Sequence, residues 1–397
     1  MHSLLTLATA TVLQEATEAQ GSNPLVALVA FLLMLGLLVV VHELGHFLTA
    51  IKLGIKVDEF GIGFPPRAMV MFERNGVKYT LNWLPLGGFV RFASSEDGSA
   101  DDPLYGAGGS LAAASPWRKI AVMVAGPLMN LFLAMAIFAI LFFAMGVPQP
   151  TGRQVLSQIF PDTPAAQAGM LPGDRLVSLD GQAVPSAAEI SAVGQLRNGT
   201  PIEALVLREG QEVRLRITPG PWTAPDGAEV PVGFGFSYGA EVEHVAVGVF
   251  GAIGHGISYS FELTGRMLEA LAGLPASLMG IFTPTPSPHG EPIGPLGIAR
   301  ATGEVIQQPG GFVNFWNLTA ILSLNLFILN LLPIPALDGS HIVFALIEWL
   351  RGGKKVPPEK EAMVHALGFM ALMGLMLLIT VNDVMNALSG APVLGGG

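Results

Sequence analysis

The feature that most constrains this chain is a long stretch without charge near its N-terminus. No Asp, Glu, Lys, Arg or His occurs between Glu18 and His42, and the apolar part of the stretch begins at Leu25. A helix needs about 20 consecutive apolar residues to cross the hydrocarbon core of a bilayer. Charged residues make up 13% of the chain, against about 25% in soluble domains. The sequence therefore predicts a membrane protein whose first span covers residues 25–50.

Three further apolar stretches and the positions of the basic residues define the predicted topology. Spans are expected at residues 120–147, 313–340 and 362–382. Lys and Arg are absent before Lys52 and after Lys360, and loops rich in these residues stay on the cytoplasmic side. We therefore expect the cytoplasmic loops to be residues 51–119 and 341–361. The 1–24 lead, the insertion between the second and third spans and the 383–397 tail are expected outside.

A candidate metal site lies at the end of the first predicted span, in the sequence His42-Glu43-Leu44-Gly45-His46. Residues four apart share a face of a helix, so His42 and His46 can bind one metal ion beside Glu43. A catalytic zinc ion usually has three protein ligands and one open position. The chain has no Cys, and Thr49 and Lys52 stand where an extended motif would place a glycine and a third histidine. The third ligand must therefore come from another segment.

Asp338 is the best candidate for this third ligand. It is the first charged residue after Glu304 and follows Pro333 and Pro335, which end the preceding apolar helix. A carboxylate at such a position in a membrane protein is a functional-site candidate. Glu43 would take a proton from the attacking water and pass it to the leaving amine, so the predicted reaction is peptide hydrolysis.

Other polar residues of the apolar segments have simpler interpretations. The non-functional alternative for the His-Glu motif is a chance match at a helix end, where polar side chains meet the lipid headgroups. Asn325 is expected to form hydrogen bonds between helices, whereas Asn330, one turn before the prolines, is placed to hold an extended substrate backbone. His341 is expected near the site but not on the metal. The other histidines are expected to be structural: His244, His255, His289 and His365.

The loop after the first span contains a predicted β-hairpin. Strand-like runs at Arg67–Phe72 and Val77–Leu84 flank Asn75-Gly76, a dipeptide suited to a tight turn. The segment that follows, Pro85-Leu86-Gly87-Gly88-Phe89, is too apolar for an ordinary surface loop. We therefore expect a β-hairpin beside the site.

Residues 151–239 alternate apolar and polar positions and predict a separate α+β domain. The stretch from Pro164 to Gly181 resembles the PDZ domains of bacterial proteases, and one copy is visible. A glycine-rich run is similar to the strand with which PDZ domains bind a peptide carboxylate by strand addition; the alternative is a plain hydrophobic strand. Its residues are Gly233, Phe234, Gly235 and Phe236. Residues 240–312 are expected to hold interfacial amphipathic helices, with Glu262 and Arg266 paired, and a linker.

Taken together, these motifs resemble those of the site-2 protease family of intramembrane zinc metalloproteases, in particular the bacterial regulator-of-sigma-E protease group. The resemblance covers nearly the whole chain after Leu25. It rests on the His-Glu helix, the hairpin with its Pro-Leu-Gly-Gly-Phe segment, the Gly126-Pro127 span, the PDZ insertion and the Asn330–Gly339 motif. Some members of the group carry two PDZ domains, whereas this chain shows one.

The resemblance implies one zinc ion per chain, held by His42, His46 and Asp338, with Glu43 catalytic. It implies cleavage of single-span substrates already trimmed by a site-1 protease, typically anti-sigma factors, with signal-peptide remnants as a further class. The membrane-associated hairpin would pair with the unwound substrate, with Asn75, Gly76, Gly87 and Gly88 as its substrate-binding residues. The PDZ domain would exclude bulky outer domains. The implied location is the bacterial inner membrane, with both termini and the PDZ domain outside and the active site toward the cytoplasm.

Two other functions compete with proteolysis. A catalytically idle membrane receptor could use the PDZ domain to sense envelope peptides, but the intact Glu43 argues against it. A transporter with a proton relay would distribute charged residues over several spans, whereas here they gather at one end. The net charge of −10 comes from soluble-looking stretches, so no nucleic-acid partner is expected.

Overall fold

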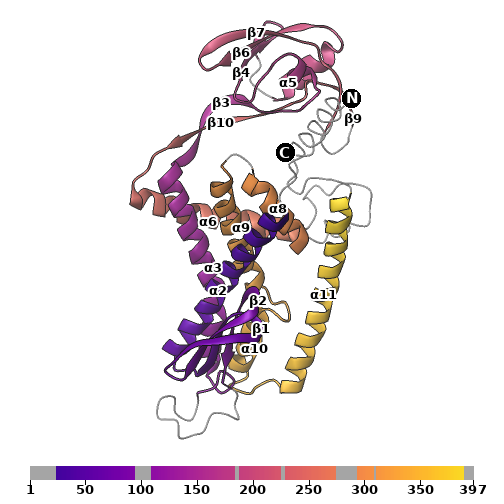
Figure 1. Ribbon diagram of the computed structural model, residues 1–397. Coiled ribbons are helices and arrows are strands. Elements are labelled where there is room, and N and C mark those ends of the chain that lie inside the picture. The colour runs from indigo at the N-terminus through magenta and orange to yellow at the C-terminus, as the bar shows by residue number, and fades with distance from the viewer. Residues whose placement is uncertain are drawn as a thin grey trace, which may run out of the picture. The chain divides into compact units, whose positions relative to one another are not determined.

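The computed structural model describes residues 24–93, 109–183, 187–224, 229–273, 293–307 and 310–388. The chain separates into two compact units (Figure 1). The first contains the described residues of Met1–Ala144 and Gly248–Leu388, and the second contains those of Met145–Val247. The predicted leader, most of the proline-rich linker and the tail after residue 388 lie outside the described residues.

Among the described residues of the first unit, four helices are long and apolar enough to cross a membrane. They are α2 (Pro24–Lys52), α3 (Pro116–Met145), α9 (Gly311–Leu331) and α11 (Pro358–Leu388). Many of their large apolar side chains are exposed, including Leu33, Phe132 and Leu377. Exposed apolar side chains on all four helices suit a lipid environment. The predicted multi-pass helical membrane protein is confirmed at this level.

The third span is shorter than the expected range of residues 313–340. Helix α9 ends at Leu331, and a separate helix, α10, begins at Asp338 and continues to Leu350. Pro333 and Pro335 have no N–H group for helical hydrogen bonds, which stops α9. A Cβ atom on Gly339 would overlap the carbonyl of Leu332, so only glycine lets the chain turn back this closely. Much of the segment 341–361, expected as a loop, is therefore helical.

The hairpin is larger than predicted. Strand β1 covers Val57–Arg74 and β2 covers Val77–Phe92, with Asn75 and Gly76 at the turn, both at positive φ. The apolar segment 85–89, left outside the predicted strands, belongs to β2. Residues 59–62 of β1 pair with two parts of β2, one around Thr80 and the other around Phe89. The hairpin packs on α2 through a core that includes Phe47, Val57 and Val77.

Two further helices of the first unit follow the second unit in sequence. Helix α6 (Val249–Ala272) has an exposed row of large apolar residues that includes Phe250, Ile257 and Phe261. Glu262 and Arg266 form the predicted ion pair on it, at 2.6 Å. Helix α8 (Pro295–Gln307) packs on α2 and α9. The Asp383 carboxylate on α11 accepts hydrogen bonds from the N–H groups of Gly294 and Gly297 at the start of α8.

The second unit is an α+β unit with a small core. A long pair, β3 (Val147–Ile159) with β10 (Phe236–Val245), extends past the expected end at residue 239. A four-stranded sheet has the order β5-β4-β6-β7, formed by Gln182–Ala183, Arg175–Leu179, Ile202–Arg208 and Gln211–Ile217. Strand β8 (Gly220–Thr223) pairs with β9 (Glu229–Gly233).

Two helices complete the second unit. Helix α4 (Pro164–Gln167) is capped by Thr163, and the turn after it uses Gly169 at positive φ. Helix α5 (Ala187–Leu196) packs Ile190 into a core with Leu156, Leu179 and Val206. The described residues of the second unit therefore contain both short helices and strands.

Candidate metal and catalytic site

Two histidines of α2 lie side by side in the first unit. His42 and His46 are one helical turn apart, and their side chains are 11% and 6% exposed. Their Nε2 atoms are 3.2 Å apart, with the rings edge to face. A Cβ atom on Gly126 of α3 would overlap the His46 ring. Gly126, the first residue of the Gly-Pro pair in α3, therefore leaves room for the His46 ring because it has no side chain.

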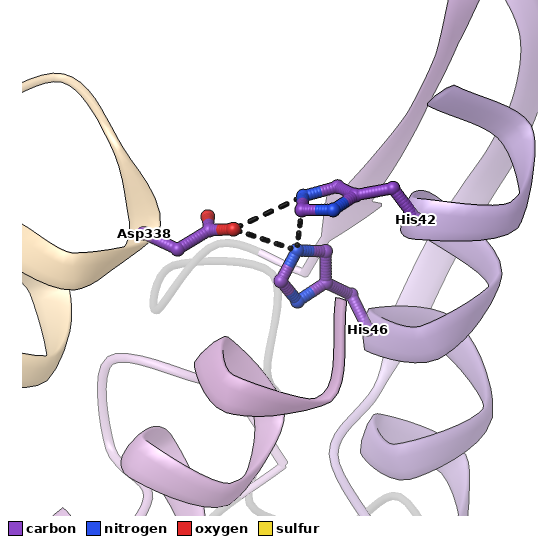
Figure 2. A group of neighbouring side chains, drawn as sticks. All are labelled: His42, His46 and Asp338. Carbon is purple, nitrogen blue, oxygen red and sulfur yellow. Dashed lines mark hydrogen bonds and ion pairs between the residues drawn. The ribbon is translucent and has the colours of Figure 1, made fainter. Parts of the chain in front are cut away.

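Asp338 brings a carboxylate to the same point from a distant part of the chain (Figure 2). Its Oδ2 atom lies 3.0 Å from Nε2 of His42 and 3.3 Å from Nε2 of His46. Asp338 is the first residue of α10, where the positive end of the helix dipole favours a carboxylate. The turn before it is closed by hydrogen bonds from the N–H of Leu337 to the Ile334 carbonyl and from Ser340 to Leu337.

The spacing of these three atoms fits a bound zinc ion. Ligands at the usual zinc distances and a tetrahedral angle lie about 3.4 Å from one another, close to the three distances here. Nδ1 of His46 is 2.8 Å from the Val122 carbonyl, which only accepts, so Nδ1 carries the proton and Nε2 presents a lone pair. Oδ2 of Asp338 receives no hydrogen bond from the described residues. Three potential ligand atoms therefore converge on one point.

Asn130 of α3 orients the second imidazole. It is fully buried, and its Nδ2 atom lies 3.2 Å from Nδ1 of His42, while its Oδ1 atom has no partner among the described residues. Oxygen and nitrogen of a carboxamide are exchanged by a half-turn. With Oδ1 toward the ring, Asn130 accepts a hydrogen bond from the Nδ1–H of His42, so the lone pair of Nε2 is free for a metal. No spacing rule links Asn130 to His42, so the sequence alone does not indicate this contact.

Glu43 lies beside strand β2. A Cβ atom on Gly88 would lie 3.8 Å from Cγ of Glu43, and the N–H of Val90 donates a hydrogen bond to its carboxylate. Gly87 approaches Val39 of the same helix, with φ at +108°. The two glycines thus let the backbone of β2 lie directly against the motif helix.

The other predicted substrate-binding residues lie in different settings. Asn330 is half-buried in the last turn of α9, and Asn75 and Gly76 form the exposed tip of the hairpin. In the second unit, Phe234 is buried, and Phe236 pairs with Ile159. The carbonyls of Phe234 and Gly235 accept hydrogen bonds from Ala165 and Phe160. The peptide-binding role of residues 233–236 stays a prediction.

The additional histidines also differ in their surroundings. His244 lies in β10 opposite Pro148, and the His255 ring is 6.5 Å from that of Phe142. His289 lies outside the described residues. His341 and His365 stack on each other at 4.4 Å and, with Glu361, form a second group of side chains that could hold a metal ion.

Comparison with known proteins gives one family and several curated relatives. A family model described as peptidase family M50 matches residues 30–375. The zinc metalloprotease RasP of Oceanobacillus iheyensis is 30% identical and is matched over 90% of this chain and 98% of its own length. A protein of Agrobacterium fabrum, provisionally named zinc metalloprotease Atu1380, is 32% identical over 90% of this chain and 95% of its own. The regulator of sigma-W protease RasP of Bacillus subtilis is 29% identical, over 90% and 97% respectively.

Proposed function

Since this chain belongs to peptidase family M50 and is an intramembrane zinc metalloprotease, we propose that His42, His46 and Asp338 hold its zinc ion. We propose further that Glu43 moves the protons of peptide hydrolysis. The observation that carries the proposal is the convergence of Oδ2 of Asp338 with the two Nε2 atoms, at 3.0 and 3.3 Å. Two helices distant in sequence supply the three atoms, which a chance helix-end motif would not explain.

Zinc, when bound, polarises the scissile carbonyl and makes water a stronger nucleophile. The chain's own residues supply the rest of the chemistry. Glu43, beside the metal ligands, accepts the proton of the attacking water and donates it to the leaving amine nitrogen. Val122 and Asn130 hold the two imidazoles with Nε2 toward the ion. The site therefore needs no titratable group beyond the ligands and Glu43.

The hairpin is proposed to bind the substrate backbone. A transmembrane helix keeps its amides bonded internally, so it must be unwound before a carbonyl can reach the zinc ion. Strand β2 passes Glu43 at Gly88, and a strand at this position can replace the lost hydrogen bonds by strand addition. Asn330, at the end of α9 before the Asp338 turn, would hold the chain on the other side. Asn75 and Gly76 would act at the hairpin tip.

The substrates are proposed to be single-span proteins of the anti-sigma factor type, cut after a site-1 protease has removed their outer domains. The name of the Bacillus subtilis relative, regulator of sigma-W protease, supports this class. Signal-peptide remnants would fit the same site because they too are short apolar helices.

The second unit is proposed to be a PDZ domain that excludes substrates with large outer parts. It is inserted between two candidate spans, and the distribution of Lys and Arg supports an external position, with both termini outside. Under the same rule the zinc site lies toward the cytoplasmic face of a bacterial inner membrane. Gly233, Phe234, Gly235 and Phe236 are the proposed peptide-binding residues.

The decisive test of the function is cleavage of a single-span reporter by the purified enzyme and by Glu43→Gln, with zinc measured in both. We expect about one zinc ion per chain in both proteins and loss of cleavage in the variant. Equal cleavage would remove Glu43 from the reaction, and would favour another catalytic group. Asp338→Asn should lose both zinc and cleavage, whereas Asn325→Ala, on the same α9–α10 segment, serves as a matched polar control.

The exclusion role can be tested by removing the second unit. Val147 pairs with Val245, so the two ends of the unit are adjacent and a short Gly-Ser linker can replace residues 147–245. We expect the shortened enzyme to cut reporters both with and without a folded outer domain, while the intact enzyme cuts only the trimmed form. Unchanged selectivity would count against exclusion by this unit.

A further inference from the structure

The turn that carries Asp338 is held from outside by helix α11. Ala336 has φ at +76°, a left-handed conformation that an alanine rarely adopts because its Cβ crowds the backbone. Its N–H group donates a hydrogen bond to Nδ1 of His365, at 3.2 Å. Ser340 Oγ lies 3.4 Å from the same nitrogen. The His365 ring thus contacts the chain both two residues before Asp338 and two residues after it.

Packing fixes the position of the His365 ring. It stacks on His341 at 4.4 Å and lies 5.5 Å from the ring of Phe344, both on α10. One turn along α11, a Cβ atom on Gly368 would overlap Pro335, so the α11 backbone lies directly against the turn. The ring is therefore held by α10 on one side while its Nδ1 atom faces the Ala336 amide.

The proton of the neutral ring must lie on Nε2. A backbone N–H can only donate, so Nδ1 of His365 must present its lone pair to Ala336. Glu361 lies on the Nε2 side, 3.9 Å away, and is also 3.7 Å from Nδ1 of His341. A carboxylate there favours the tautomer with the proton on Nε2.

The same assignment argues against a second metal site at these three residues. Their ligand atoms lie within 4.8 Å of one another, but a metal on Nε2 of His365 would require the proton on Nδ1. That proton would point at the Ala336 N–H and break the hydrogen bond that holds the turn. The cluster is better suited to fixing a tautomer than to binding an ion.

We propose that His365 is a positioning residue for the zinc site: its Nδ1 atom holds Ala336 in the left-handed conformation and so fixes where Asp338 presents its carboxylate. The inference rests on the proposed function, in which Asp338 is a zinc ligand. It makes α11, which supplies no ligand, a determinant of how firmly zinc is retained.

The test compares three substitutions in the full-length enzyme. His365→Asn places an amide oxygen near the position of Nδ1, His365→Gln places its polar end near the position of Nε2, and His365→Ala removes both. The readouts are zinc per chain and the rate of zinc transfer to a chromogenic chelator, with thermal unfolding measured alongside. We expect Gln and Ala to speed zinc loss by on the order of 10-fold, and Asn to stay within about threefold of wild type.

Zinc loss and zinc content in these variants and in His341→Phe decide the proposal. Equal zinc loss from the Asn, Gln and Ala variants would overturn it, because a packing role does not distinguish the δ from the ε position. His341→Phe keeps the ring stack and should leave zinc content and zinc loss unchanged, which supports the proposal. A second zinc equivalent in wild type that His341→Phe removes would overturn it in favour of a metal-binding cluster.

Asp338→Asn separates this inference from the proposed function. If Asp338→Asn retains zinc like wild type, the proposed ligand set fails, and the positioning role fails with it. If Asp338→Asn loses zinc while all three His365 variants keep it, the ligand set stands and the positioning role alone is refuted.

Discussion

Nδ1 of His42 and the carboxamide of Asn130 lie 3.2 Å apart inside the helix bundle, on the opposite side of the ring from Asp338. Asn130 is held in turn by its backbone carbonyl, which accepts a hydrogen bond from Ser323 of α9 at 2.7 Å. Three apolar helices therefore meet at the group that orients one proposed ligand. Groups of this kind commonly change metal affinity by about 10- to 100-fold.

Asn130→Leu should therefore lower zinc affinity by about 10-fold or more, because Nδ1 of His42 loses its acceptor. Asn130→Asp keeps an acceptor at the same place and should retain zinc close to the wild-type level. Competition with a chelator of known affinity measures both. Equal affinity in the Leu and Asp variants would show that the hydrogen bond does not orient the ring.

Gly126→Ala should disrupt the site without removing any polar group. The added methyl would overlap the imidazole of His46, and the ring cannot move away without losing its hydrogen bond to Val122. We expect loss of most bound zinc and of proteolysis, measured by elemental analysis and reporter cleavage.

Gly36→Ala is the matched control for this substitution. Gly36 lies on α2, and the nearest atom to its added Cβ would be the Pro85 carbonyl at 3.9 Å, an ordinary contact distance. This variant should keep its zinc. Loss of zinc from both variants would attribute the effect to helix packing in general.

The parts of the site that sequence could predict are those with a local signal. The helical spacing of His42 and His46 and the Pro-x-Pro context of Asp338 pointed to atoms that the structure places within 3.3 Å. Asn130 and His365 escaped because their partners are distant in sequence and hydrogen-bond geometry has no periodic signature. Helix α10 was missed because the basic residues between Arg351 and Lys360 indicated a cytoplasmic loop over residues 341–361, whereas the apolar part of that segment is helical.

The hairpin shows the same limit. The Asn75-Gly76 turn has a clear local signal. The length of β2 instead depends on tertiary pairing, because residues 59–62 of β1 pair both with residues 78–81 and with residues 88–91 of β2. The predicted strands do not include the Gly87-Gly88 pair, because glycine weakens a strand. It lies within β2 because α2 leaves no room for a side chain there.

Glu59 should stabilise the hairpin in a pH-dependent way. The residue is 1% exposed, and it accepts hydrogen bonds from Thr80 at 2.7 Å and Arg67 at 2.7 Å, with Arg91 also bound. Burial raises the pKa of Glu59, but the hydrogen bonds and the two guanidinium charges outweigh it, so the pKa lies below its ordinary value of 4.5. Its stabilisation is present above that value and is lost as pH falls through the lower folded pKa.

Glu59→Gln should therefore cost about 2 kcal/mol at pH 7, the usual range for hydrogen bonds to a charged group. Thermal unfolding of detergent-solubilised wild type and variant checks this, and the gap between their midpoints should narrow as the pH falls below 4.5. A gap that is constant down to acid pH would show that the charge of Glu59 does not stabilise the hairpin.

The buried ion pair between Lys119 and Glu348 ties the helix of Asp338 to the helix of Asn130. Lys119 Nζ lies 2.6 Å from Oε2 of Glu348, and their side chains are 16% and 9% exposed. Removing one partner leaves a buried charge without compensation, which costs about 3 kcal/mol. Replacing both partners with apolar residues of similar size is often nearly neutral.

Lys119→Met and Glu348→Met should each lower the unfolding midpoint and speed zinc loss, because α10 carries Asp338 at its first turn. The double variant should recover most of the stability, because no unpaired charge remains. Zinc loss from the double variant decides what the pair does for the site. If it stays fast while stability is restored, the ion pair itself aligns Asp338 with His42 and His46. If zinc retention recovers together with stability, apolar packing between α3 and α10 holds the carboxylate in place equally well. Fully additive losses in the double variant would contradict the coupling, since they would mean that the two charges do not interact.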